Sequence, residues 1–131
     1  MARRGPAILE AIDHSTDVRL NISELLSRLD NDRELLRELV QLFKDECPRL
    51  IQSLRDAISR QEANAVETIS HSLKGMLANV SATRAVSAAS LLEEIGRARK
   101  HSQLGEALAA LESEIAVLLP ELDACLVGAQ L

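Results

Sequence analysis

A long apolar stripe in the middle of the chain is the feature that most constrains its fold. Between residues 36 and 58, apolar side chains recur every three or four positions: Leu36, Leu39, Val40, Phe43, Cys47, Leu50, Ile51, Leu54 and Ile58. An α-helix places such positions on one face, whereas a strand would require strict alternation. Pro48 falls inside the stripe, but the stripe keeps its phase on both sides. We therefore predict one continuous, kinked helix from Asn31 or Asp32 to about Gln61.

Similar stripes predict the other elements. A short helix is expected to begin at an Asn21 or Ser23 cap and to end near Leu29. Longer helices are expected over residues 63–80, 82–100 and 102–127, with Pro120 either kinking the last one or ending its regular part. The short connections favour an all-α fold, an antiparallel (up-down) four-helix bundle with a short extra N-terminal helix.

Size and composition agree with that fold. The chain has 131 residues, enough for one domain, and its single aromatic residue leaves the core to leucine, alanine, isoleucine and valine. We expect residues 1–20 to form a tail or linker and residues 21–131 to form the domain. A net charge of −5 argues against a nucleic-acid partner. No segment has the length of a membrane span or the pattern of a signal peptide. Cys47 and Cys125 lie on apolar stripes, which indicates reduced thiols and a cytoplasmic location.

The helix expected over residues 63–80 carries an unusual outward face. On a helical wheel the apolar residues cluster on one side: Val66, Ile69, Leu73, Leu77 and Val80. His71 points roughly 160° away from that side, towards solvent. Lys74 and Gly75 follow it at i+3 and i+4, the positions whose side chains lie beside it.

These three residues suit the chemistry of an anion bound to a histidine. An exposed imidazole titrates near neutral pH and offers a ring nitrogen as a nucleophile. Lys74 places an ammonium group where an anion on His71 would lie. Gly75 leaves room for another protein surface, at a cost of about 1 kcal/mol relative to alanine. Glu67 at i−4 is a candidate for setting the tautomer of the ring.

Pattern alone leaves a chance cluster on a solvated face as an alternative. No second histidine at i±4 of His71 completes a zinc motif, and no phosphate-binding glycine loop indicates an ATP site. Glu93 and Glu94 are expected on a solvated helix face. His14 and His101 are expected in the tail and in a connection between helices, both solvated.

The segment around His71 resembles the signature of a known family. The segment "SHSLKGMLANVSA" is similar to the signature of histidine phosphotransfer (HPt) domains, Ala-His-x-Leu-Lys-Gly followed by small residues and Asn-x-Gly-Ala. The resemblance extends over residues 21 to about 127 and includes the mid-helix proline. Ser70 replaces the usual alanine, and Ser81 replaces the glycine that ends the family's helix. If the left-handed cap is retained, serine carries a steric cost there.

The resemblance implies that His71 is phosphorylated on Nε2, that Lys74 lies near the phosphoryl oxygens and that Gly75 gives access. It also implies a docking surface for partners on this helix and on part of the long helix beside it. The residues expected to dock are Glu67, Thr68, Ser70, Ser72 and Ala78.

By the same resemblance the domain is a phosphocarrier without its own ATP site rather than a complete enzyme. It accepts a phosphoryl group from a receiver-domain aspartate and passes it to an aspartate of another receiver. No cofactor is expected, because the Mg²⁺ belongs to the receiver. The implied partners are response-regulator receiver domains and a sensor histidine kinase, either separate or in the same chain as part of a hybrid kinase. A monomer is expected, with no membrane contact by this segment.

Two other classes remain open at this stage. One is a four-helix interaction module that binds a receiver or another partner without phosphotransfer. The other is a metal-dependent hydrolase, which would require paired ligands on facing helices, and the sequence shows none.

Overall fold

The structure, a computed structural model, describes the backbone of residues 20–130 and side chains through residue 127. The predicted tail therefore lies almost entirely outside the described residues. The described chain is helical throughout, with short connections between its elements: α2 (Ile22–Arg28), α3 (Arg33–Ser59), α4 (Ala63–Asn79), α5 (Thr83–Arg97), the 3₁₀ helix η1 (His101–Gln103) and α6 (Leu104–Gln130).

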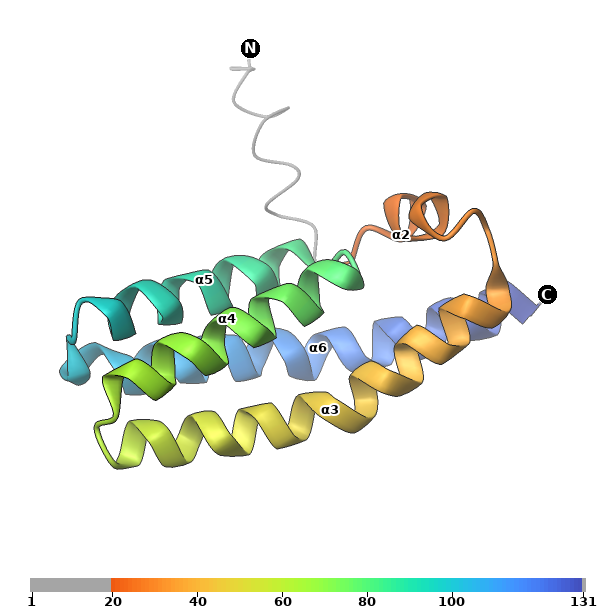
Figure 1. The fold of residues 1–131 in the computed structure, drawn as a ribbon. Helices are drawn as coiled ribbons and strands as arrows, with labels where there is room; N and C mark the ends of the chain where they lie inside the picture. The colour runs from red at the N-terminus through yellow and green to blue at the C-terminus, as the bar shows by residue number, and fades with distance from the viewer. Residues whose placement is uncertain (1–19, 131) are drawn as a thin grey trace, which may run out of the picture.

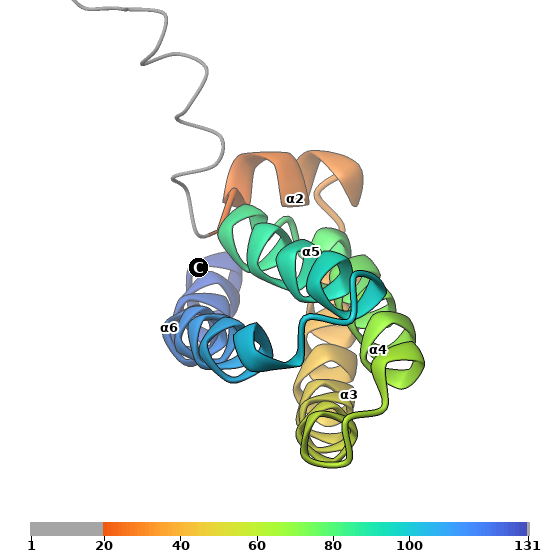
Figure 2. The same cartoon turned by 90° about the vertical axis from the view of Figure 1, so that its left-hand side faces the viewer.

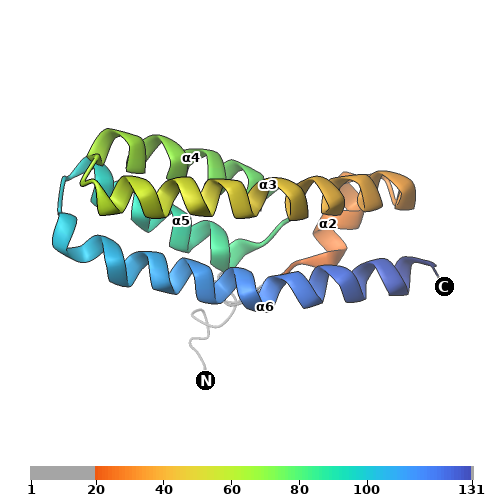
Figure 3. The same ribbon diagram turned by 90° about the horizontal axis from the view of Figure 1, so that it is seen from below.

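The four long helices surround a common interior. Figure 1 shows α3, α4, α5 and α6 alternating in direction along the chain, and Figure 2 looks down the bundle with the four helices around its centre. Figure 3 shows that α3 and α6 extend beyond α4 and α5 at the end where α2 lies. Leu25 of α2 is fully buried, so the short helix contributes to the core. The predicted all-α bundle with a short N-terminal helix is confirmed.

Local sequence explains where the helices begin and why they continue. The Asp32 side chain caps α3 by accepting a hydrogen bond from the Leu35 amide at 3.0 Å, and Asn21 caps α2 in the same way. Both internal prolines are accommodated. The long helix α3 continues through Pro48 and bends near its middle (Figure 1), and α6 continues through Pro120 to residue 130. Of the two alternatives for Pro120, the end of regular helix is wrong.

The core is aliphatic, as the composition requires. Phe43 is buried in the same core as fully buried leucines from α2 to α6, and both cysteines are buried and free. Burial raises the pKa of the Cys47 thiol to about 11 and also raises the pKa of Cys125, because the thiolate is poorly solvated there. The predicted core position of both cysteines is confirmed.

The helix that carries His71 ends in a left-handed cap formed by serine. Ser81 has a φ of 57°, its amide donates to Ala78 O, and the Ala82 amide donates to Leu77 O, both at 3.0 Å. These two bonds define a Schellman motif. The left-handed cap is thus retained although glycine is absent.

Residues of α2 reinforce this cap. The Arg28 guanidinium donates to Ala78 O at 2.8 Å and to Ser81 Oγ at 3.3 Å, and the Asn21 amide donates to Ser81 O at 3.1 Å. The bond from Arg28 gives Ala78 O a second donor at the helix end, and the bond from Asn21 satisfies Ser81 O just beyond it. They fix the C-terminal end of α4 against α2.

Candidate functional site

His71 stands on the outer face of α4, as the wheel predicts. Its side chain is 69% exposed, while Val66, Leu73 and Leu77 on the opposite side are fully buried. The buried face is rotated slightly from the predicted one, because Ile69 is only partly buried and Ser70 is fully buried. The prediction that Ser70 belongs to a docking surface is therefore wrong, since its side chain faces the interior of the bundle.

Lys74 is held by an ion pair beside His71, whereas Gly75 faces open space. The Lys74 ammonium is one-third exposed and bonds to Glu93 Oε1 at 2.7 Å. A Cβ atom added to Gly75 would have no neighbour within 4 Å. Packing within the bundle therefore does not require a glycine there, and the space it leaves is open to the outside.

Glu93 was expected on a solvated helix face, and this prediction is wrong. Its side chain is 9% exposed rather than solvated, and its Oε2 lies 3.0 Å from His71 Nδ1. Glu94, by contrast, is exposed as predicted. The carboxylate is buried because α5 approaches α4 closely at Gly96, where an added Cβ would lie 3.0 Å from Val66 Cγ1 and 3.1 Å from the amide nitrogen of residue 67. One feature of the sequence indicates this close approach: two small residues, Ala89 and Gly96, lie at i−4 and i+3 of Glu93.

The charges around Glu93 keep it ionised. The hydrogen bond from Lys74 lowers the pKa of Glu93, the bond from His71 lowers it further, and these effects outweigh burial, which acts in the opposite direction. Arg97 Nη2 lies 3.3 Å from the same carboxylate. An ionised carboxylate can only accept hydrogen bonds, so the imidazole donates through Nδ1–H. When the ring is neutral, its Nε2 carries the free lone pair.

Glu67, the residue predicted to set the tautomer, has another partner. Its Oε2 accepts a hydrogen bond from Arg97 Nε at 2.9 Å, and this pairing raises the pKa of the Arg97 guanidinium. The prediction for Glu67 is wrong, and Glu93 from the neighbouring helix takes the place that it was expected to fill.

Two hollows flank the exposed ring. A groove between α3 and α4 runs past His71 and Gly75. Its lining includes Leu42, which is exposed, and Glu46 and Met76, which are partly buried. On the other side a smaller hollow is lined by His71 and its neighbours: Glu67, Thr68, Ser72 and Glu93. Four of the residues predicted to dock partners remain reachable from solvent: Glu67, Thr68, Ser72 and Ala78.

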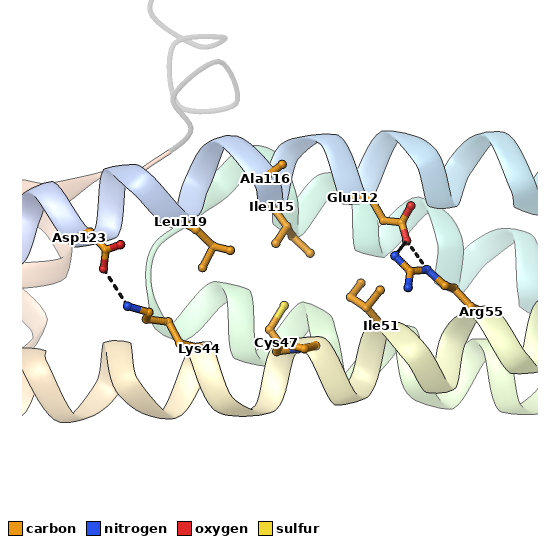
Figure 4. A pocket seen from close by; sticks show the side chains of 10 residues that line it. Lys44, Cys47, Ile51, Arg55, Glu112, Ile115, Ala116, Leu119 and Asp123 are labelled. Atoms are coloured by element: carbon orange, nitrogen blue, oxygen red, sulfur yellow. Dashed lines mark hydrogen bonds and ion pairs between the residues drawn. The ribbon is translucent and has the colours of Figure 1, made fainter.

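A further groove lies between α3 and α6, away from all of the predicted site residues. Figure 4 shows its apolar floor, which includes Cys47 and Leu119, with an ion pair at each end. Lys44 Nζ lies 3.0 Å from Asp123 Oδ1, and Arg55 Nη2 lies 2.6 Å from Glu112 Oε2.

Within the described residues, no three His, Cys, Asp or Glu side chains gather as a metal site would require. His14 lies outside the described residues. His101 is part of η1 and is partly buried, so its predicted exposure to solvent is wrong. Among residues 20–130, no helix combines the length and apolar character needed to cross a bilayer.

Comparison with known families settles the family of this chain. The model of the Hpt domain family matches residues 38–121, which include α4, α5 and the whole His71 site. The chain belongs to the Hpt domain family. Hpt domains are helical phosphocarrier modules of phosphorelay signal transduction, and they interact in general with receiver domains and kinases. No curated protein and no solved structure matches the chain.

Proposed function

We propose that this Hpt domain accepts a phosphoryl group on His71 Nε2 from a receiver-domain aspartyl phosphate and passes it to an aspartate of another receiver. One observation carries the proposal. The carboxylate of Glu93 engages Nδ1 at 3.0 Å, so the lone pair of Nε2 lies on a largely exposed ring. Lys74 and the open space at Gly75 lie on the same face.

The proposed step follows from this geometry. Nε2 attacks the phosphorus, the bond to the aspartate oxygen breaks, and its electron pair remains on the receiver carboxylate. The ring becomes cationic, and Glu93 stabilises it through the Nδ1–H bond. The Lys74 ammonium lies one turn from the acceptor nitrogen and can turn from Glu93 to the phosphoryl oxygens. The Mg²⁺ ion expected in this reaction belongs to the receiver, and no cofactor is proposed for this chain.

The receiver is proposed to dock over the groove between α3 and α4. Leu42 is 56% exposed at the edge of that groove and offers apolar surface beside the ring. Thr68, Ser72 and Ala78 present small side chains on the same helix as His71, so that a partner can approach closely. A monomeric state, a cytoplasmic location and a sensor kinase as a further partner stay predictions.

Transfer from a receiver tests the proposal directly. Purified candidate receivers phosphorylated by acetyl phosphate are mixed with this protein, and acid-labile phosphate on the Hpt chain is followed. We expect labelling of the wild type and none of His71→Gln. Equal labelling of the variant, or no transfer from any cognate receiver, contradicts the proposal. Receiver binding without transfer would favour the alternative of a pure interaction module.

Two further variants test the neighbours of His71. Gly75→Leu should keep the helix content and block transfer, because the added side chain fills the space beside the ring. Gly105→Leu is the matched control, since Gly105 is also open to solvent but lies at the start of α6. Lys74→Ala should slow transfer while the fold survives. Normal transfer by Gly75→Leu would show that access to the ring does not depend on this glycine.

A further inference from the structure

The ring nitrogen that does not react faces a buried carboxylate. Glu93 Oε2 lies 3.0 Å from His71 Nδ1, so a ring held in this position meets the carboxylate at Nδ1. We propose that Glu93 is a positioning residue that keeps Nδ1 protonated after phosphorylation, and so makes the phosphoryl group easier to release. The inference rests on the proposed phosphorylation of His71.

The phosphorylated ring has two protonation forms, and the site distinguishes them. In the neutral form Nδ1 carries a lone pair, which would face the carboxylate oxygen of Glu93, another acceptor. In the cationic form Nδ1–H donates to that oxygen across the same 3.0 Å, and the opposite charges attract. Glu93 therefore favours the cation and raises the pH at which the phosphorylated ring loses its proton.

The protonation form decides how the phosphoryl group leaves. When the P–N bond of the cation breaks, the electron pair returns to Nε2 and the ring leaves as a neutral imidazole that keeps its Nδ1 proton. The neutral form would have to leave as an imidazolate anion, a much poorer leaving group. The phosphorus bonds to a carboxylate oxygen of the receiver during transfer, or to a water oxygen during hydrolysis, in which case the water proton goes to solvent.

The other charged groups around the site are consistent with this role. Lys74 occupies the second oxygen of Glu93 at 2.7 Å, and Arg97 reaches Oε2 at 3.3 Å. Glu67 is engaged by Arg97, and on the far side of the ring Glu46 of α3 pairs with Arg49 at 3.4 Å. When Lys74 turns to the phosphoryl oxygens, the Nδ1–H cation and Arg97 remain as partners of Glu93. Both of these cationic partners favour the ionised form of the carboxylate.

The test uses phosphoramidate, which phosphorylates histidine without any receiver. The phosphorylated wild type, Glu93→Gln and Glu94→Gln are titrated by ¹⁵N and ³¹P NMR, and hydrolysis is followed over the same pH range. The midpoint of the ring titration in wild type should lie about one pH unit above that of Glu93→Gln. Above both midpoints, hydrolysis of Glu93→Gln should be about tenfold slower, since the fraction of cation falls tenfold per unit. Glu94→Gln removes an exposed charge one residue away and should match the wild type.

A second comparison keeps the inference testable if Glu93→Gln does not fold. The phosphorylated wild type is titrated folded and in urea, and the folded ring should titrate at the higher pH. Equal midpoints in wild type and Glu93→Gln, or a folded midpoint no higher than the unfolded one, would overturn the inference. If those results coincide with normal receiver transfer, only this inference fails. If the shift is found but no receiver transfers, only the proposed function fails. Failure of phosphoramidate to label the folded wild type at His71 overturns both, because it shows that Nε2 does not react.

Discussion

Two interfaces of the bundle place charged residues in opposite settings. Between α4 and α5, the side chain of Glu93 is 9% exposed, and its carboxylate bonds to His71 and to Lys74. Between α3 and α6, the ion pairs Lys44–Asp123 and Arg55–Glu112 span an apolar groove, with side chains 32–54% exposed. The same residue types therefore serve a buried site in one place and a solvated surface in the other.

The difference follows from how closely the helices approach. At Gly96, α5 lies so near α4 that a Cβ would meet backbone atoms of α4, and Glu93 one turn earlier is enclosed. Between α3 and α6 the helices leave a hollow, and long charged side chains reach across it in water (Figure 4). A buried carboxylate without partners is costly, whereas solvated ion pairs contribute little. Substitutions at the interface between α4 and α5 should therefore change the free energy of unfolding more than substitutions at the groove between α3 and α6.

The largest effect is expected from Gly96→Ala. The new methyl group would lie 3.0 Å from Val66 Cγ1 and push α5 away, which should cost about 1–3 kcal/mol in the free energy of unfolding. Gly105→Ala is the control, because its Cβ meets nothing and should add about 0.5 kcal/mol from helix propensity. Urea denaturation measures both. Equal stability of the two variants would contradict the close approach of α4 and α5.

The next effect is expected from Ser70→Ala on the buried face of α4. The Ser70 hydroxyl is fully buried and lacks a hydrogen-bond partner within the part of the chain that the structure describes. Removing it should stabilise the domain by about 1 kcal/mol. Ser72→Ala, on the exposed face, should add only the helix-propensity part, about 0.5 kcal/mol. Thermal and urea unfolding compare the two, and a destabilised Ser70→Ala would show that the hydroxyl has a partner.

These residues also show what the sequence could predict. The outward position of His71 depends on the helical period alone, which is local and readable. The position of Glu93 depends on the distance between two helices, which Gly96 sets and a single-helix wheel does not contain. The same limit explains the error at Ser70, because contacts with neighbouring helices rotate the buried face away from the centre of the apolar stripe. Glu67 has the i−4 spacing that would let it contact His71, but its carboxylate is paired with Arg97 of α5 instead.

A smaller difference in stability is expected between glycine substitutions in the two connections that flank α4. Gln61, before α4, and Ser81, after it, both have a φ of 57°. Gln61→Gly should stabilise the domain by about 1 kcal/mol, because glycine adopts this conformation without steric cost. Ser81→Gly should gain less, since it also loses the 3.3 Å bond from Arg28 to Ser81 Oγ. Urea denaturation of both variants, with Arg28→Ala as a background that removes the bond, distinguishes the two contributions. An equal gain at both positions in the wild-type background would show that the Arg28 bond adds nothing.

The smallest effects are expected at the groove between α3 and α6. Arg55 contacts a single oxygen of Glu112, Oε2, through both Nε and Nη2, and the two side chains are 51% and 32% exposed, so water and salt weaken the attraction. A double-mutant cycle with Arg55→Ala and Glu112→Ala should give a coupling of about 0.5 kcal/mol, which falls further in about 1 M salt. Lys44→Ala should cost no more, because its pair with Asp123 is equally solvated. A coupling above about 2 kcal/mol would mean that this interface is as enclosed as the one at Glu93, and the contrast between the two would fail.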